Sequence, residues 1–140
     1  MDVRDLMTTD PACCTADNGL QDVARAMLEN DCGAIPIVAD GRPVGMVSDR
    51  DIVVRAVAEG RNPVDMTAEE IMSTPVATVA EDASIEELFD VMEDQQIRRV
   101  VVVDADGKVC GIVAQADVAE LADAEDVADV VEKVSEPAGR

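Results

Sequence analysis

The chain has 140 residues, a formal net charge of −20, 48% hydrophobic residues and one aromatic residue, Phe89. Its length suits one compact domain, or two closely packed halves, with a real hydrophobic core. A surface built from 31 acidic and 11 basic residues repels nucleic acid and anionic membranes, and one aromatic residue cannot form a stacking platform for single-stranded bases. We therefore expect neither nucleic acid nor a membrane as a partner.

The acidity is of an unusual kind, because the chain has only two lysines, Lys108 and Lys133. Abundant carboxylates with scarce lysine resemble the composition of proteins from salt-loving organisms, where high salt screens self-repulsion. No N-terminal apolar run has the length of a signal peptide, and no stretch approaches the length of a membrane span. The sequence predicts a halophile-like protein of the cytoplasm.

The four cysteines, Cys13, Cys14, Cys32 and Cys110, form no C-x-x-C pair, and the chain has no histidine. A mixed cysteine–histidine zinc site is therefore excluded, and we expect no metal. The adjacent Cys13 and Cys14 have two interpretations, a redox pair or small apolar strand residues, and we favour the second.

An internal repeat organises the chain. Residues 6–9 correspond to 71–74, and each stretch is followed by a proline and by a β-prone run, at 12–15 and 76–79. An amphipathic helix follows in each half. The first is opened by Asn18 or Gly19 and has Leu20, Val23, Ala24, Met27 and Leu28 on its apolar face. The second begins at a capping box over 84–87 and has Ile85, Leu88, Phe89 and Met92 on its apolar face.

Both helices lead into strand pairs, 34–39 with 44–48 and 99–104 with 109–114. Asp-Gly steps in the connections at 40–43 and 105–108 indicate hairpin turns. The offset between the repeats changes there from 65 to 66 residues, which predicts one inserted loop residue. Each half then ends in a helix, at 50–59 and 116–134.

The fold class is therefore α/β, of the α+β kind, with two strand–helix–strand–strand–helix units. We divide the chain into a first unit at 1–62, a second at 63–123, and a helical extension with a frayed tail at 124–140. Each three-stranded sheet has one face on its own helices, so the two units should pack through the other faces with pseudo-twofold symmetry. A ligand site is expected in the crevice between them, at the strand ends.

The most informative stretch is the strand-to-helix turn 45–51. Ser48 or Asp49 can cap the helix, and Asp51 adds a carboxylate that can accept both hydroxyls of a ribose. Unpaired backbone N–H groups at the helix start suit phosphate. The alternative is that these side chains only cap the helix. A second copy at 111–117 favours a site, although Ala114 replaces the serine.

This pattern resembles the cystathionine-β-synthase (CBS) domain, used in tandem as a Bateman module, over residues 2 to about 122. The matching stretches are 3–7, 33–38, 45–52, 97–104 and 111–118. The resemblance implies a binding module for an adenosine-containing ligand such as AMP, ADP, ATP, NAD(H) or S-adenosylmethionine, with no other cofactor.

In the family, the Gly-h-h-Ser/Thr-x-x-Asp turn holds ribose, which implies Ser48 and Asp51 for the first site. Only Asp117 matches in the second site, which is therefore weaker or absent. The family's apolar adenine slot corresponds to Ile35, Pro36, Met46 and Val47 in one half and to Val101, Ile112 and Val113 in the other. Some of these are equally explained as core strand residues. Arg98 and Arg99 match the family's basic phosphate contacts, with salt bridging to nearby acids as the alternative.

The resemblance thus predicts a stand-alone regulatory CBS pair that senses such a ligand, associates as a homodimer and acts on an unknown protein partner in trans. The alternative is a structural or oligomerisation module with vestigial clefts, which Ala114 favours. We expect no enzyme, because the chain has no histidine, P-loop, Gly-x-Ser-x-Gly motif or metal-ligand cluster.

Overall fold

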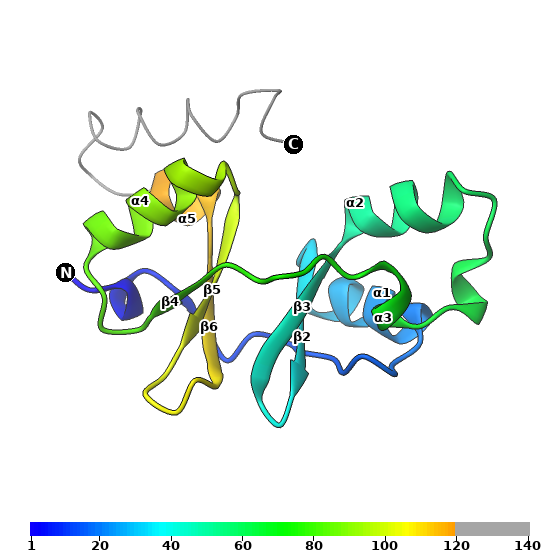
Figure 1. Cartoon of the computed structure of the whole chain (residues 1–140), viewed down its shortest axis with the longest axis horizontal. Coiled ribbons are helices and arrows are strands. Elements are labelled where there is room, and N and C mark those ends of the chain that lie inside the picture. Colours follow the sequence, from blue (N-terminus) through cyan, green and yellow to red (C-terminus); the bar gives the residue numbers. More distant parts are fainter. Residues whose placement is uncertain (120–140) are drawn as a thin grey trace. The chain divides into compact units, whose positions relative to one another are not determined.

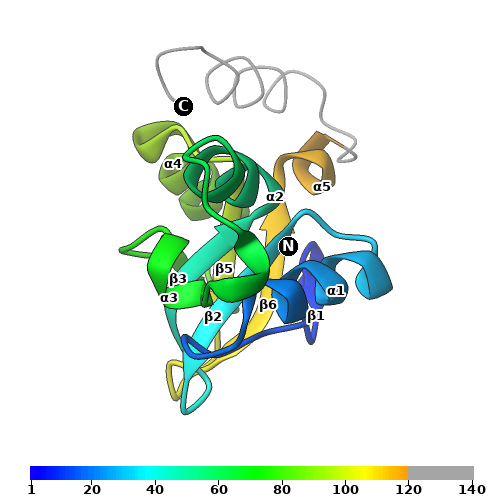
Figure 2. The same cartoon turned by 90° about the vertical axis from the view of Figure 1, so that its right-hand side faces the viewer.

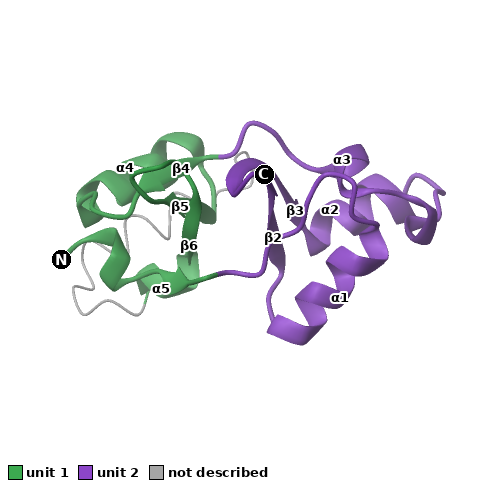
Figure 3. Cartoon of the chain, turned by 90° about the horizontal axis from the view of Figure 1, so that it is seen from below, with its two compact units in different colours: residues 1–10, 77–140 green, residues 11–76 purple. Residues whose placement is uncertain are grey.

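A computed structural model describes residues 1–119 of the chain. The predicted extension at 124–140, and most of the predicted helix at 116–134, lie outside these residues. The chain forms two compact units (Figure 3). One consists of Met1–Asp10 together with the chain from Ala77 onward, and the other of Pro11–Val76.

The Pro11–Val76 unit is built on an antiparallel hairpin backed by helices (Figure 1). Its elements are α1 (Leu20–Asn30), β2 (Ala34–Ala39), β3 (Arg42–Ser48), α2 (Asp49–Ile52), the π-helix η2 (Val53–Val57), the 3-10 helix η3 (Pro63–Asp65) and α3 (Ala68–Ile71). Helices α1 and α3 lie on the same face of β2 and β3, as Figures 1 and 2 both show. Leu20, Val23 and Met27 of α1 are buried there, as their helical spacing predicts.

The unit that contains the chain from Ala77 onward has a four-stranded sheet in the order β1-β6-β5-β4. Its elements are the 3-10 helix η1 (Val3–Asp5), β1 (Thr8–Thr9), β4 (Thr78–Ala80), α4 (Ile85–Gln95), β5 (Arg99–Val103), β6 (Val109–Ala114) and α5 (Gln115–Ala119). Strands β4 and β5 are parallel, and the other two pairs are antiparallel. Leu88 and Met92 of α4 pack on Val100, Val102 and Val113 of the sheet.

The two hairpin turns confirm the predicted insertion. In the first, Asp40 and Gly41 both have positive φ, 52° and 81°, as a two-residue type I′ turn requires. In the second, the Asp104 N–H donates to Lys108 O at 2.9 Å, and Gly107 has a φ of 79°. The connection enclosed by that bond, 105–107, is one residue longer than the first turn.

Strand β1, at the edge of the sheet beside β6, was not predicted. Thr8 and Thr9, from the first sequence repeat, pair with Ile112 and Gly111 of the second repeat. In the other unit, Ser73 pairs with Met46 through two backbone hydrogen bonds of 2.9 and 3.1 Å. Each sheet therefore has an edge segment from the other repeat, so the compact units and the sequence repeats 1–62 and 63–123 are two different divisions of the chain.

Two glycines allow these edge segments to approach. A Cβ built on Gly45 would lie 2.4 Å from Met72 Sδ, and one built on Gly111 would lie 2.3 Å from Met7 Sδ. Any side chain at these positions would overlap the methionine. The repeated glycine and the repeated methionine therefore form one packing device that occurs once in each unit.

Several local predictions need correction. The predicted helix at 50–59 is α2 followed by the π-helix η2, in which the Ala58 N–H donates to Val53 O at 2.8 Å. The β-prone run 12–15 forms only a single bridge, between Cys14 and Ile37.

The two predicted helix starts are defined by their caps. Gly19, rather than Asn18, is the N-cap of α1. At α4 the Ser84 hydroxyl accepts from the Glu87 N–H, which is one half of the predicted capping box. Within residues 1–119, no helix is both long and apolar enough to cross a membrane.

Candidate functional site

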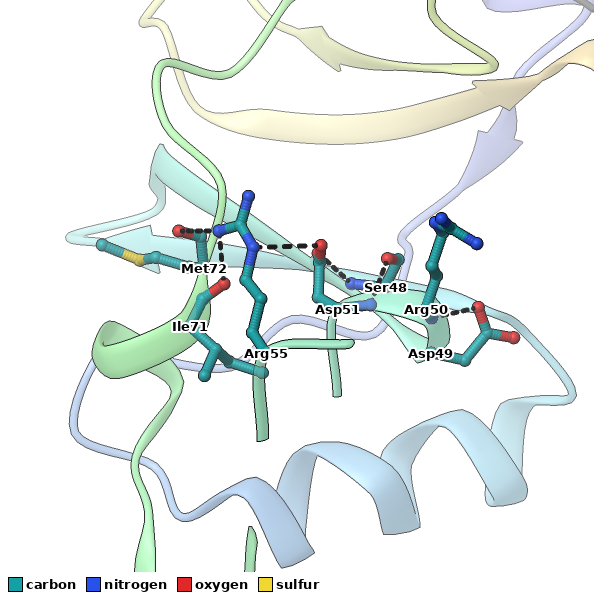
Figure 4. Close-up of polar contacts among 7 residues, drawn as sticks. All are labelled: Ser48, Asp49, Arg50, Asp51, Arg55, Ile71 and Met72. Carbon is teal, nitrogen blue, oxygen red and sulfur yellow. Dashed lines mark hydrogen bonds and ion pairs between the residues drawn. The ribbon is translucent and has the colours of Figure 1, made fainter. Parts of the chain in front are cut away.

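The turn from β3 into α2 holds Ser48 and Asp51 in a reciprocal cap (Figure 4). The Asp51 N–H donates to Ser48 Oγ at 3.1 Å, and the Ser48 N–H donates to Asp51 Oδ2 at 2.9 Å. Ser48 is only 9% exposed, and the side chain of Asp51 is 13% exposed. The structure therefore brings the two predicted ribose ligands together in one fixed arrangement.

The expectation that free backbone N–H groups at this turn suit phosphate is wrong. The Asp49 N–H donates to Gly33 O at 2.9 Å, and the Arg50 N–H donates to Asp49 Oδ1 at 2.8 Å. The Asp51 N–H is taken by Ser48, as described above. Each of these three N–H groups already has an acceptor within the protein, so none is available to bind an anion.

The cap leaves hydrogen-bonding capacity on both side chains. A hydroxyl that accepts one N–H still has its own proton to donate and a second lone pair. A carboxylate has about four acceptor positions, and the Ser48 N–H uses one of those on Asp51. The pair can therefore hold a ligand that presents neighbouring hydroxyl groups without losing the helix cap.

Arg55, which the sequence analysis missed, also contacts this turn. Its Nε lies 3.9 Å from Asp51 Oδ1, and its NH1 donates to Ile71 O at 3.0 Å and to Met72 O at 3.4 Å. Figure 4 shows its guanidinium between the Asp51 carboxylate and the two carbonyls. The spacing of four residues from Asp51 was the available signal, because such residues share a helix face.

The predicted adenine residues of the first repeat divide between the two faces of the hairpin. Ile35 and Val47 are completely buried in the core cluster under α1 and α3. Pro36 and Met46 are cross-strand partners outside that cluster, and they alternate with the core residues. The structure thus places Pro36 and Met46 on the same face as Ser48, whereas Ile35 and Val47 point into the core.

The second turn keeps half of this arrangement. The Ala114 N–H donates to Asp117 Oδ2 at 2.8 Å, so Asp117 is oriented as Asp51 is, without a hydroxyl beside it. Val101 and Ile112 are cross-strand partners outside the core cluster, on the face of Ala114. Val113, in contrast, belongs to that cluster.

The two predicted phosphate ligands lie at the start of β5. Arg99 is the cross-strand partner of Ala114 and is half-buried. Arg98 is exposed, and its carbonyl accepts from the Gln115 N–H at 2.7 Å. The corresponding pair in the first repeat is Ala34 with Ser48. The first turn thus has the Ser48 hydroxyl beside the small Ala34. The second turn has Arg99 beside Ala114, which has no hydroxyl.

The cysteines and acidic residues define no metal centre within residues 1–119, where no three potential ligands gather. Cys14 packs against the core cluster of its unit. Burial, and then the charge of Asp22, raise the pKa of the Cys14 thiol. This disfavours the reactive thiolate, in agreement with a small apolar role for Cys14.

Comparison with known proteins identifies the family. The model of the CBS domain matches residues 3–57 and 68–124. The chain belongs to the CBS-domain family and is a tandem pair of such domains with a mixed α+β fold.

Two relatives illustrate how far the similarity extends. Hypoxic response protein 1 of Mycobacterium tuberculosis is 40% identical over 117 residues, 83% of this chain and 81% of that protein. An uncharacterized protein of Methanopyrus kandleri, MK0525, is 36% identical over 119 residues, and this chain spans 58% of its length.

Solved structures include relatives with bound ligands. The crystal structure of hypoxic response protein I, which has two coordinated zinc ions, is 38% identical with a TM-score of 0.77, over 86% of this chain and 99% of that chain. The CBS domain protein PAE2072 of Pyrobaculum aerophilum, complexed with AMP, is 26% identical with a TM-score of 0.80 (92% and 99%). The CBS pair of MJ0100, in complex with 5′-methylthioadenosine and S-adenosylmethionine, is 28% identical with a TM-score of 0.75 (85% and 97%).

Proposed function

We propose that this CBS pair is a regulatory module that binds an adenosine-containing ligand at the Ser48–Asp51 turn. The observation that carries the proposal is the reciprocal cap, which fixes a hydroxyl and a carboxylate with unused hydrogen-bonding capacity. The ligands of PAE2072 and MJ0100 share an adenosine moiety and therefore a ribose with neighbouring hydroxyls. We assign both hydroxyls to Asp51 and assign Ser48 as the second polar contact.

The two repeats should bind with different strength. Asp117 is the only ribose contact that the second turn offers, because Ala114 has no hydroxyl. The loss of one hydrogen bond of this kind costs roughly 1–3 kcal/mol. We therefore assign the first turn as the stronger site.

The remaining contacts follow from the sheet faces. Pro36 and Met46 are the proposed adenine contacts of the first repeat, and Val101 and Ile112 those of the second. Ile35, Val47 and Val113 belong to the cores, so their contribution is to support those residues from behind. Arg99, beside Ala114, is the proposed phosphate contact, with Arg98 next to it, because a guanidinium matches phosphate geometry.

The output of such a module is a change in how it associates with a protein. We propose a homodimer that acts on a protein partner in trans. Val53, Val54 and Val57 of η2 are 57%, 42% and 56% exposed, which is an apolar surface suited to self-association. Val54→Glu is expected to convert dimers into monomers in sedimentation equilibrium. A wild-type chain that is monomeric at high concentration would contradict the homodimer.

The second candidate is a structural or oligomerisation module with vestigial sites and no catalytic activity of its own. Ala114 and the exposed valines favour it, because neither feature needs a ligand. In this case nucleotides leave the thermal stability of the protein unchanged.

A thermal-shift screen distinguishes the two candidates. AMP, ADP, ATP, NADH and S-adenosylmethionine are tested in high salt, and a ligand at a hundred times its Kd adds about 2.7 kcal/mol of stability. We expect the double variant Ser48→Ala, Asp51→Ala to lose this shift. Ser84→Ala is the matched control, since it removes a similar cap at α4 and should keep the shift. Equal binding by the double variant and wild type would refute the ribose assignment.

A further inference from the structure

Arg55 connects the Asp51 carboxylate to a distant piece of the same unit. Its NH1 donates to the carbonyls of Ile71 and Met72, the end of α3, while its Nε faces Asp51 Oδ1 at 3.9 Å. The carbonyls at a helix end lack partners within the helix and carry partial negative charge, so a guanidinium is well matched to them. Arg55 is therefore anchored at its far end, although its side chain is 49% exposed.

The two oxygens of Asp51 have different environments. Oδ2 accepts from the Ser48 N–H at 2.9 Å, and Oδ1 faces the guanidinium. The hydrogen bond to Oδ2 restrains one oxygen of the carboxylate, and the guanidinium beside Oδ1 restrains the other. Because Arg55 is half-exposed and the two atoms, Nε and Oδ1, are 3.9 Å apart, this ion pair contributes little to overall stability. Its consequence is therefore expected in the orientation of the carboxylate.

The local backbone supports this arrangement. Arg55 lies within the π-helix η2, a type of distortion that is frequent at functional sites. Its neighbour Ala56 is completely buried, which fixes the segment against the core. In the second repeat, the residue that corresponds to Arg55 is Leu121. A leucine cannot supply the charge, so the arginine distinguishes the first turn from the second.

We propose that Arg55 is a positioning residue of the first site, which holds Asp51 in the orientation that accepts the ribose hydroxyls. This inference rests on the proposed function, because it assumes that Asp51 contacts ribose. The effect of Arg55 is limited to the binding of the ribose hydroxyls. Discrimination between a ribose with hydroxyls and one without them depends on Arg55, whereas recognition of adenine and phosphate does not.

The test compares the affinities of AMP and 2′,3′-dideoxy-AMP by calorimetry. Both ligands have the same base and phosphate, so the ratio of their Kd values isolates the hydroxyls. Every protein carries Asp117→Asn, which removes the carboxylate of the second turn. We expect a ratio of at least about tenfold without further change, since hydrogen bonds to a charged group are strong. The ratio should be near one in Asp51→Asn and below about threefold in Arg55→Gln.

Arg61→Gln is the matched control. Arg61, which follows this helical segment, also contacts α3, through an ion pair with Glu70 at 3.5 Å that does not involve Asp51. Its ratio should equal that of the Asp117→Asn background. If Arg55→Gln does not fold by circular dichroism, Arg55→Lys replaces it. The single ammonium group of lysine cannot contact both Asp51 and Ile71 as the guanidinium does. The ratio of Kd values in Arg55→Lys should therefore be less than half of the ratio in the Asp117→Asn background.

Two results overturn the inference in different ways. If Asp51→Asn removes discrimination while the Arg55 variant keeps it, Arg55 does not position the carboxylate, and the proposed function stands. If the Asp117→Asn background itself shows no discrimination, or if Asp51→Asn leaves it unchanged, the ribose assignment fails and the role of Arg55 fails with it.

Discussion

The substitution Gly45→Ala tests how closely the edge segment packs in the Pro11–Val76 unit. A Cβ at this position would lie 2.4, 2.9 and 3.1 Å from Sδ, Cγ and Cβ of Met72. Rotation of the methionine relieves the first two contacts only. The third involves an atom close to the backbone, and the next residue, Ser73, is held to Met46 by two hydrogen bonds. Overpacking of this kind costs about 1–3 kcal/mol.

A second substitution separates overpacking from other causes. Met72→Ala removes the two atoms that overlap most, Sδ and Cγ. By itself it should lower the free energy of unfolding by about 1–2 kcal/mol. This is less than the roughly 2–5 kcal/mol for a fully buried methionine, because Met72 is half-buried. In the double variant the overpacking and the cavity compensate each other, because the methyl group introduced at position 45 occupies part of the space left by the Met72 side chain. The double variant should therefore be more stable than the sum predicts, by at least about 1 kcal/mol.

The measurement is equilibrium unfolding in urea at constant molar salt. We expect a lower midpoint for Gly45→Ala with an unchanged slope. Gly19→Ala is the control, since the nearest atoms to its Cβ lie at 3.9 Å, an ordinary contact, and only a small capping loss is expected. Wild-type stability of Gly45→Ala, or strictly additive costs in the double variant, would refute the packing argument.

Three further predictions concern the caps, the charge and a thiol. Ser48→Ala should lose about 1 kcal/mol, and Ala114→Ser, which completes the second capping box, should gain up to about as much; thermal melts showing no difference between these two variants would contradict the capping geometry. A net charge of −20 predicts a higher Tm in molar KCl than in dilute buffer, and a Tm independent of salt would contradict self-repulsion. Burial raises the pKa of the Cys14 thiol above its ordinary value of 9.0. The stability that the buried neutral thiol contributes is therefore present below pH 9 and is lost as pH rises through the pKa of the folded state. Cys14→Ala should make the free energy of unfolding less dependent on pH above pH 9, and an unchanged pH dependence would contradict this prediction.

Short-range chemistry explains what could be predicted from the sequence. The Asp40-Gly41 turn follows from a residue pair that tolerates positive φ, and the helix α1 follows from apolar spacing. The reciprocal cap of Ser48 and Asp51 follows from a local three-residue spacing. Each of these features is decided within a few residues, and the Asp-Gly step and the apolar helix spacing occur in both repeats.

Features that depend on distant parts of the chain could not be predicted. The pairing of Thr8 with Ile112, and the anchoring of Arg55 on Ile71, join segments with no pattern in common. The face assignment of Ile35 also needed the register of the hairpin, because consecutive apolar residues do not reveal which of them point inward. The Asp49 N–H has no acceptor in the local sequence pattern, because the Gly33 carbonyl that accepts it lies outside the turn.

The exchange of edge segments sets an order in which the chain can be completed during synthesis. The Pro11–Val76 unit has all its pairing partners once Val76 has been made, since Ser73 joins Met46 from nearby. Thr8 and Thr9 must wait for Ile112 and Gly111, at the far end of the described chain. Contacts between such remote segments are slow to form, because a long loop has to close first. Until residue 112 has been translated, Thr8 and Thr9 therefore lack the strand with which they pair.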